Sequence, residues 1–201
     1  MNALGQLGRW RLLRRATAML CAVTLFGCAS LSQDESEVPP RQALGAFQLE
    51  GRFSLRQDNQ NNSGRIDWRH AADGDRVLLA SPFGQGVAEI TAEPGKATLT
   101  ASDGQVFAAP DVPTLTEKVL GYRLPLQRLA DWVRGSAAGG EVVERDAQGR
   151  PLRVRLEDWR IEYDYEGDDP EAPPSRLFAE RIGSFELRLR IERWTALPEA
   201  R

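Results

Sequence analysis

The sequence contains few of the residue types that build catalytic and metal-binding sites. Its 201 residues include two cysteines and one histidine, so neither a disulfide framework nor a cysteine-rich metal centre is expected. The histidine, His70, precedes the turn residues Ala71-Ala72-Asp73-Gly74 and is expected on the solvated surface at a strand end. The serine in Ala80-Ser81-Pro82 is followed by proline and does not connect a strand to a helix, which argues against a nucleophile elbow.

Long apolar runs are also scarce. The segment from Ala16 to Phe26 carries no charge but is too short to cross a bilayer, which takes about 20 apolar residues. It follows four arginines and precedes a small residue, Gly27, and this order is typical of a secretory signal peptide. Leu25-Phe26-Gly27-Cys28 resembles a bacterial lipobox, in which the cysteine thiol receives a diacylglycerol and becomes the new N-terminus. An ordinary signal peptide with an incidental cysteine is the alternative.

This layout predicts three segments. Residues 1–27 form the cleaved lipoprotein signal peptide, residues 28–45 form the lipidated N-terminus and a flexible tether, and residues 46–201 form a single domain. The tether is predicted because it is polar, acidic and proline-bearing, with Pro39-Pro40 near its middle. Ala29 is not the aspartate associated with inner-membrane retention, so the lipobox resemblance implies the outer membrane.

Removal of the signal peptide makes the chain more acidic. Taking 27 residues from 201 leaves 174, a length that suits one domain with a sizeable core. The removed segment carries four of the 26 basic residues and no acidic one, so 22 basic residues face 29 acidic ones, for a net charge of −7. Such a chain is a poor candidate for nucleic-acid binding or for polybasic membrane binding. With Cys21 removed and Cys28 acylated, no thiol remains for a disulfide or a metal.

From residue 47 onward, apolar and charged residues alternate with a period of two. The clearest runs are Phe47 to Leu55, Arg65 to Arg69, Leu152 to Leu156, Trp159 to Tyr165 and Phe185 to Glu192. This alternation is typical of antiparallel strands that cover a core on one side only. Turn signals such as Asp73-Gly74 and Asp103-Gly104 separate the runs and predict about ten to eleven strands in one strongly curved sheet or barrel.

Two short helices are predicted in the middle of the chain. Thr114 followed by Glu117 suggests a capping box at the start of the first helix, and Gly121 ends it. The second helix runs from Leu126 to Val133 with its apolar residues on one side, and Gly135 ends it. Two amphipathic helices among so many strands are expected to pack across the concave side of the sheet as a lid.

Several segments, in this order and spacing, resemble the LolB family, whose members receive lipoproteins at the outer membrane from the periplasmic carrier LolA. The segments are Phe47-x-Leu49-x-Gly51-Arg52-Phe53, Gly64-x-Ile66-x-Trp68, Leu78-Leu79-x-Ser81-Pro82-Phe83-Gly84, Gly121-x-x-Leu124-Pro125-Leu126, Leu129-x-x-Trp132-x-x-Gly135 and Trp159-x-Ile161-x-Tyr163, with Trp194 near the end. The resemblance covers nearly all of the mature chain. It implies a mainly β fold, an incomplete antiparallel barrel whose helical lid encloses a hydrophobic cavity for acyl chains.

The resemblance also implies partners and a cavity lining. The partners would be a LolA-type carrier, acylated lipoprotein cargo and outer-membrane lipid, with no nucleic acid, no energy source and no cofactor beyond the acyl groups on Cys28; a monomer is expected. Fifteen apolar residues would line the acyl-chain cavity: Phe47, Leu49, Phe53, Ile66, Trp68, Leu79, Val119, Leu120, Leu129, Trp132, Val133, Ile161, Tyr163, Leu187 and Leu189.

The segment Ser81-Pro82-Phe83-Gly84-Gln85-Gly86 is the strongest candidate for a functional loop. Proline and glycine mark it as a turn between two strands, yet Phe83 at its centre is large and apolar. In the LolB family this position carries an exposed apolar residue, usually leucine, which enters the bilayer, and an aromatic ring also partitions well into a membrane interface. Pro82, Phe83 and Gly84 would therefore form the membrane-insertion loop. The alternative is that Phe83 folds back and fills the cavity.

Two other functional classes share some of these sequence features. An enzyme has little support, although the scattered acidic residues leave open a carboxylate pair of the glycosidase type. The acidic group Asp168, Asp169 and Glu171 lies in a proline-rich segment and is expected to be a solvated loop. A structural or scaffolding lipoprotein would share the anchor and the tether, but it would need no cavity for an acyl chain.

Overall fold

The computed structural model describes residues 38–57, 60–181 and 183–198. The predicted signal peptide, the lipobox residue Cys28 and the first part of the predicted tether lie outside the described residues. No helix in the described ranges is long and apolar enough to cross a membrane.

The described residues form eleven strands, two α-helices and one short 3₁₀ helix. In chain order they are η1 (Arg41–Ala43), β1 (Phe47–Gln57), β2 (Gln60–Ala71), β3 (Gly74–Ala80), β4 (Gly86–Glu93), β5 (Lys96–Ala101), β6 (Val106–Ala109), α2 (Val112–Leu120), α3 (Leu126–Val133), β7 (Glu141–Arg145), β8 (Pro151–Leu156), β9 (Trp159–Asp164), β10 (Arg176–Arg181) and β11 (Phe185–Ala196).

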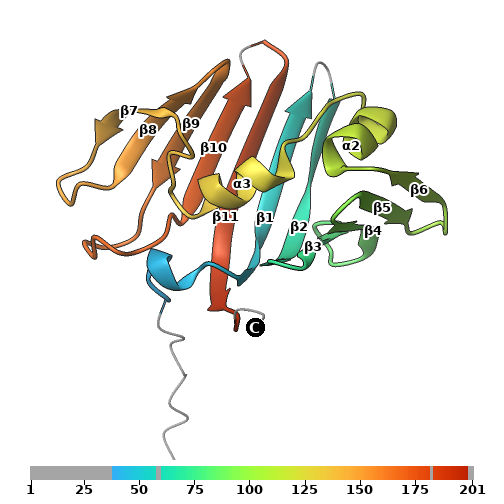
Figure 1. The fold of residues 1–201 in the computed structure, drawn as a ribbon, viewed down its shortest axis with the longest axis horizontal. Coiled ribbons are helices and arrows are strands. Elements are labelled where there is room, and N and C mark those ends of the chain that lie inside the picture. The colour runs from blue at the N-terminus through green and yellow to red at the C-terminus, as the bar shows by residue number, and fades with distance from the viewer. Residues whose placement is uncertain (1–37, 58–59, 182, 199–201) are drawn as a thin grey trace, which may run out of the picture. The chain divides into compact units, whose positions relative to one another are not determined.

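All eleven strands belong to one sheet in the order β6-β5-β4-β3-β2-β1-β11-β10-β9-β8-β7. Neighbouring strands are antiparallel, and most are joined by short hairpins. The exceptions are β9 and β10, which are joined by residues 165–175, and the central pair, in which β1 lies beside β11 from the far end of the chain. The edge strands β6 and β7 are not paired with each other, so the curved sheet stays open (Figure 1). The predicted incomplete antiparallel barrel of ten to eleven strands is confirmed.

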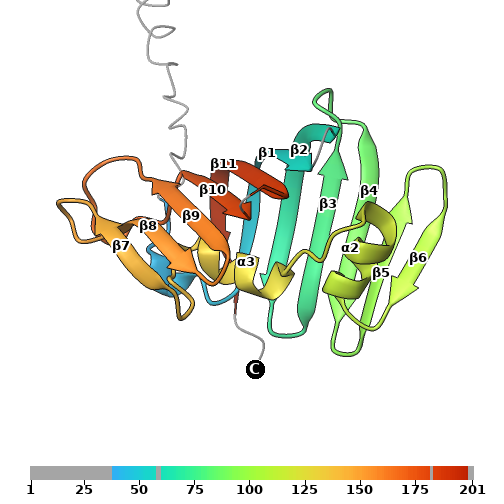
Figure 2. The same cartoon turned by 90° about the horizontal axis from the view of Figure 1, so that it is seen from above.

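Alternation along the strands gives the sheet one apolar and one charged face. In β1, Phe47 and Leu49 are buried while Gln48 and Glu50 lie on the other side, next to charged residues of β2 and β11. The helices cover the apolar, concave side: α3 crosses the middle strands, and α2 packs on β5 and β6 (Figures 1 and 2). A β-sheet with one apolar face must bury it against another layer, and the two helices supply that layer.

The ends of α2 are set by local chemistry, with one difference from the sequence prediction. α2 begins at Val112 because the Asp111 carboxylate accepts a hydrogen bond of 2.7 Å from the Thr114 amide. Hydrogen bonding from the Thr114 side chain, and then from its amide, lowers the pKa of Asp111. The predicted start at Thr114 was therefore wrong: the capping residue lies three positions earlier. Gly121 ends α2 with a left-handed φ of 74°, as glycine allows.

The packed part of the chain begins earlier than the predicted start at residue 46. Leu44 is fully buried in the hydrophobic core, and its carbonyl accepts a hydrogen bond from Arg134. Before it, η1 is held against the loop between β9 and β10 by a 2.9 Å hydrogen bond from the Arg41 amide to the Glu171 carbonyl. Pro39-Pro40 indicated a tether, but the apolar Leu44 and these bonds fix the segment in the fold.

The burial of Leu44 predicts a stability effect that an exposed residue of the same segment should not share. Leu44→Ala should lower the free energy of unfolding by about 2–5 kcal/mol, because it removes buried methyl groups and leaves a cavity. Val38→Ala, at a side chain that is 56% exposed, should change it by less than about 0.5 kcal/mol. Chemical denaturation of the two variants checks this. Equal midpoints for both would show that the segment is not part of the core.

Candidate functional site

The fifteen residues expected to line an acyl-chain cavity gather on the concave face, but most of them are packed together. Ten of them are buried members of the hydrophobic core, four are partly buried against it, and Leu120 is 45% exposed. The ten buried residues are Phe47, Leu49, Trp68, Leu129, Trp132, Val133, Ile161, Tyr163, Leu187 and Leu189. In this structure they form a closed interior, so an acyl chain would have to displace side chains to enter among them.

The closed interior is rich in aromatic rings, and none of its ten residues is charged. The ring centres of Trp132, on the lid helix α3, and Trp159 lie 5.1 Å apart. Burial raises the pKa of Tyr163, so its hydroxyl stays neutral and donates a 3.3 Å hydrogen bond to the Ser136 carbonyl. The indole N–H of Trp132 has no hydrogen-bond partner among the described residues. An apolar, uncharged interior of this kind suits a hydrocarbon ligand.

At one end of the concave face, the apolar side chains are less covered. We call these seven residues the half-exposed group: Phe53, Leu55, Ile66, Leu79, Val119, Leu120 and Leu124. Ile66 and Leu79 are paired across β2 and β3, near the strand ends that carry the loop 81–86. Gly121, which ends α2, lies close to Gln57 at the end of β1. The half-exposed group is therefore the part of the apolar interior that is easiest to reach from solvent.

Gly64 makes room for the Phe53 ring of the half-exposed group. The sequence motif that contains Gly64 does not by itself explain why glycine is needed there. A Cβ atom on Gly64 would lie 2.1 Å from the Ala80 carbonyl oxygen and 3.2 Å from the ring of Phe53. Only a residue without a side chain lets β2 approach β3 here while the Phe53 ring lies above it. This explains the glycine in the Gly64-x-Ile66 segment, and knowledge of the strand pairing was needed to see it.

The loop 81–86 projects beyond the ends of the neighbouring strands (Figure 2). Its two ends are tied by hydrogen bonds of 2.7 Å from the Ser81 amide to the Gln85 carbonyl and 2.9 Å from the Gly84 amide to the Ser81 carbonyl. Pro82 suits the second position of this turn, and Gly84 takes the left-handed φ of 88° that closes it. Phe83 stands at the tip and is 95% exposed, so it does not fold back into the interior.

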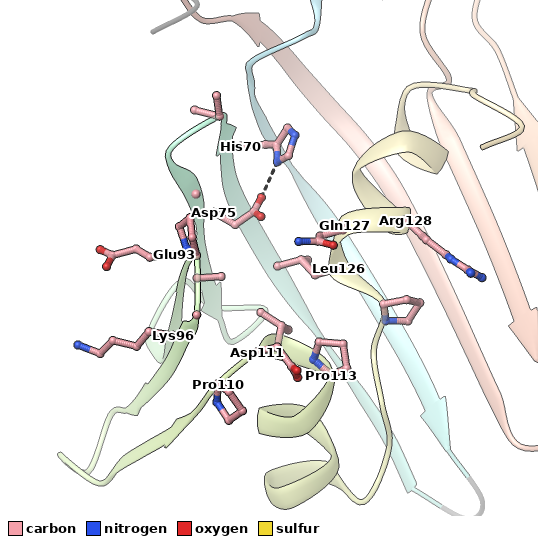
Figure 3. Close-up of a pocket in the computed structure, with 18 of the residues that line it drawn as sticks. His70, Asp75, Glu93, Lys96, Pro110, Asp111, Pro113, Leu126, Gln127 and Arg128 are labelled. Atoms are coloured by element: carbon pink, nitrogen blue, oxygen red, sulfur yellow. Dashed lines mark hydrogen bonds and ion pairs between the residues drawn. The ribbon is translucent and has the colours of Figure 1, made fainter. Parts of the chain in front are cut away.

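A separate hollow lies at the other end of the sheet. It has a volume of about 770 Å³ and is bounded by the β2–β3 and β4–β5 turns and by the starts of α2 and α3 (Figure 3). None of the fifteen predicted residues lines it, and its walls mix apolar groups with charged ones such as Glu93, Lys96 and Asp111. Such a lining does not suit an acyl chain.

His70, expected on the solvated surface, lies in the wall of this hollow instead. Its Nδ1 atom is 2.7 Å from the Asp75 carboxylate, which also accepts a 2.8 Å hydrogen bond from the indole of Trp68. The ring packs against Phe47, with centres 5.1 Å apart. The prediction missed this because Asp75 lies opposite His70 only after β2 and β3 have paired.

The acidic loop is solvated as expected, with Asp168 and Asp169 exposed, and it also has a structural role. Glu171 accepts a 2.7 Å hydrogen bond from Gln42, and Asp168 accepts one of 3.2 Å from Gln148. Asp169 accepts the Glu171 amide and shapes the loop. Across the described residues, no group of three or more histidine, cysteine, aspartate or glutamate side chains is placed to hold a metal ion.

Sequence comparisons with known proteins agree on one family. A family model described as "Outer membrane lipoprotein LolB" matches residues 45–194. An outer-membrane lipoprotein LolB of Dechloromonas aromatica is 39% identical over 92% of this chain and 98% of its own length. The LolB of Azoarcus sp. is 36% identical over 90% of this chain and 95% of its own. A solved LolA-superfamily protein of Nitrosomonas europaea covers 77% of this chain and 87% of its own at 11% identity, with a TM-score of 0.47.

The geometry of the loop predicts different effects for its two glycines. Gly84→Ala should lower the free energy of unfolding by about 1 kcal/mol, because an alanine is strained at a left-handed φ. Gly86→Ala is the matched control: its Cβ would meet nothing within 4 Å, and its φ is not left-handed. Denaturation curves of both variants check this. Equal stability of the two variants would contradict the turn geometry.

Proposed function

Because this chain belongs to the LolB family of outer-membrane lipoproteins, we propose that it accepts acylated lipoproteins from a LolA-type carrier and inserts them into the outer membrane. The family places the chain in lipoprotein localisation. The single observation that carries the finer proposal is the uncharged concave interior, whose half-exposed end lies at the same end of the strands as the loop with Phe83. One end of the domain thus presents both a site for acyl chains and a residue that suits a bilayer.

Acyl chains would enter at the half-exposed group. Side chains such as Leu79 and Val119 are already partly in contact with solvent there, so a chain can replace water before it displaces packed residues. Each methylene buried contributes about 0.8 kcal/mol. The carrier, this chain and the bilayer can all bury the methylenes of the acyl chain and gain this free energy. The cargo can therefore move to whichever site buries its acyl chain better, without an energy source.

Phe83 would then bring the domain into contact with the bilayer. The turn from Pro82 to Gly84 holds the ring away from the sheet, where it can enter the membrane interface without any change in the fold. Cys28, predicted to carry the diacylglycerol and a further acyl chain, would anchor the chain to the inner leaflet of the outer membrane. The domain would work as a monomer and without a cofactor.

A scaffolding lipoprotein without cargo is the second candidate. The observation that favours it is the closed interior, since ten of the predicted cavity residues are buried against one another. The two proposals differ in one measurable property: a receptor takes up a fluorescent acyl probe, and a scaffold does not.

If the chain is a receptor, a charged residue at the loop tip should block the insertion of cargo into the membrane and affect no other step. Phe83→Glu should leave stability and cargo acceptance unchanged, and should slow transfer of cargo into vesicles by about tenfold or more, because a carboxylate resists entry into the bilayer. Val143→Glu is the control, since Val143 is 43% exposed on the opposite edge of the sheet. Transfer is followed by vesicle flotation. Normal transfer by the Phe83 variant would refute the role of the loop.

A charged residue in the half-exposed group should weaken acyl binding, in contrast to the loop variant, which should affect insertion. Leu120→Glu should weaken uptake of a fluorescent acyl probe about tenfold, because the carboxylate would be desolvated by the entering chain. Val106→Glu is its control: this side chain is 62% exposed on the outer face of β6. Titration with the probe measures both. Equal affinities for the two variants would mean that the chain enters elsewhere.

A further inference from the structure

The convex face of the sheet carries an unusual line of arginines, which we call the arginine row. Arg176, Arg190, Arg52 and Arg65 lie directly opposite one another on the neighbouring strands β10, β11, β1 and β2. Like charges opposite each other on neighbouring strands are destabilising. Single opposed pairs also occur elsewhere, at Arg69 with Arg76 and at Arg155 with Arg160, and other arginines are placed against acids, as in Arg193–Glu50 at 3.0 Å. The row differs from these pairs because it continues over four neighbouring strands.

The row is only partly neutralised. Glu192 lies 2.8 Å from Arg52 and 3.5 Å from Arg65, and Asp164 lies 3.5 Å from Arg176. Arg190 has no carboxylate within ion-pair distance in the ranges that the structure describes. Four arginines against two acids leave two positive charges on an exposed strip, in a chain that is acidic as a whole.

Beside the row the surface is hollowed. A depression of about 610 Å³ is lined by Arg52, Arg176 and Arg190 together with Arg160, Arg188 and Phe178. The guanidinium groups of Arg188 and Arg160 lie over the Phe178 ring, at 5.3 and 5.7 Å from its centre, and the acids Glu162 and Asp164 also line the hollow. Guanidinium groups gathered around a hollow suit phosphate oxygens, which they bind in bidentate fashion.

The row leads to the loop with Phe83. Arg65, its last member, lies opposite Ala80, and Ala80 is the last residue of β3 before the loop. Phosphate groups lie at the surface of a bilayer, just outside the hydrocarbon that an inserted aromatic ring reaches. A domain whose loop tip enters the membrane would therefore bring this end of the convex face close to the lipid headgroups.

We propose that the arginine row binds the phosphate groups of anionic lipids and sets the orientation in which the domain meets the membrane. The proposal rests on the proposed function, because it takes the Phe83 loop to face the bilayer. The row would fix the tilt of the domain relative to the bilayer, which the loop alone does not. A single inserted ring is compatible with many tilts, whereas a line of four charges across the sheet can contact the headgroups in only a few. It also gives the unfavourable opposition of like charges a function.

The test uses the mature chain with Cys28→Ala, so that binding depends on the domain and not on its lipid. Vesicles of phosphatidylcholine with about a third phosphatidylglycerol are compared with pure phosphatidylcholine in a sedimentation assay at about 0.1 M salt. The unaltered domain should bind the anionic vesicles more tightly. Arg52→Gln with Arg190→Gln should weaken that binding by about fivefold for each arginine, and raised salt should remove the difference.

The control removes the same charge from the same face but away from the loop. Arg69→Gln with Arg193→Gln alters β2 and β11 nearer the opposite end of the sheet and should retain most of the binding. Equal losses in both double variants, or none in the row variant, would overturn the proposal. So would a row variant that binds vesicles normally but no longer binds the carrier, which would assign the row to an acidic protein surface.

The result can be separated from a failure of the proposed function. The row variant should still take cargo from a LolA-type carrier at the normal rate, because none of its changes lies on the concave face. If the unaltered chain takes no cargo, the receptor proposal fails whatever the vesicles show. If it takes cargo but binds both kinds of vesicle equally, only the arginine row loses its assigned role.

Discussion

The pairing of β1 with β11 is the contact on which the rest of the structure depends. It joins the first strand of the domain to the last and places both at the centre of the sheet. Without it, strands β1–β6 and β7–β11 would form two smaller sheets, each with an apolar face and too little to cover it. A bulge between Glu50 and Gly51 adjusts the register, and a Cβ on Gly51 would lie 2.2 Å from the Arg190 carbonyl oxygen, so this position requires glycine.

The same pairing creates both surfaces on which the function is proposed. On the concave side it brings Phe53 of β1 opposite Leu189 of β11, so that one apolar interior runs through the two halves. On the convex side it brings Arg52 opposite Arg190 and completes the arginine row. Because the sheet is not closed, the interior depends on two short helices for its cover, and that cover is thinnest at the half-exposed group. A receptor needs both properties. Its interior must be packed well enough for the domain to fold without cargo, and the side chains at one end must be displaced easily by an acyl chain.

What could be predicted from the sequence was local. The period of two located the strands and their apolar sides, and Gly121 marked the end of α2 because a left-handed residue is needed there. The exposed loop followed from Pro82 and Gly84, which have strong turn preferences. Pairing between distant strands could not be predicted, because a strand pattern specifies which side faces the core but not its partner. The arginine row and the contact of His70 with Asp75 both depend on that pairing.

Two further misses have local causes. Asp111, the true cap of α2, was passed over for Thr114 because both are good capping residues and only the end of β6 decides between them. The burial of Leu44 was hidden by the polar residues around it, since one leucine in a polar segment gives no period to detect. The cavity lining stays a prediction: fourteen of its fifteen residues belong to the hydrophobic core or pack against it, but the sequence could not say how tightly they pack.

The central claim is that cargo acyl chains occupy the concave interior, and one measurement tests it most directly. A lipoprotein whose acyl chain carries a photoactivatable group is transferred from a LolA-type carrier, irradiated, and the labelled residues are identified by mass spectrometry. The account predicts labels on the concave side, at Phe53 and Leu79 and on Leu129 or Trp132 of the lid helix. Labels confined to the convex face, or found only on the carrier while this chain is folded, would contradict it.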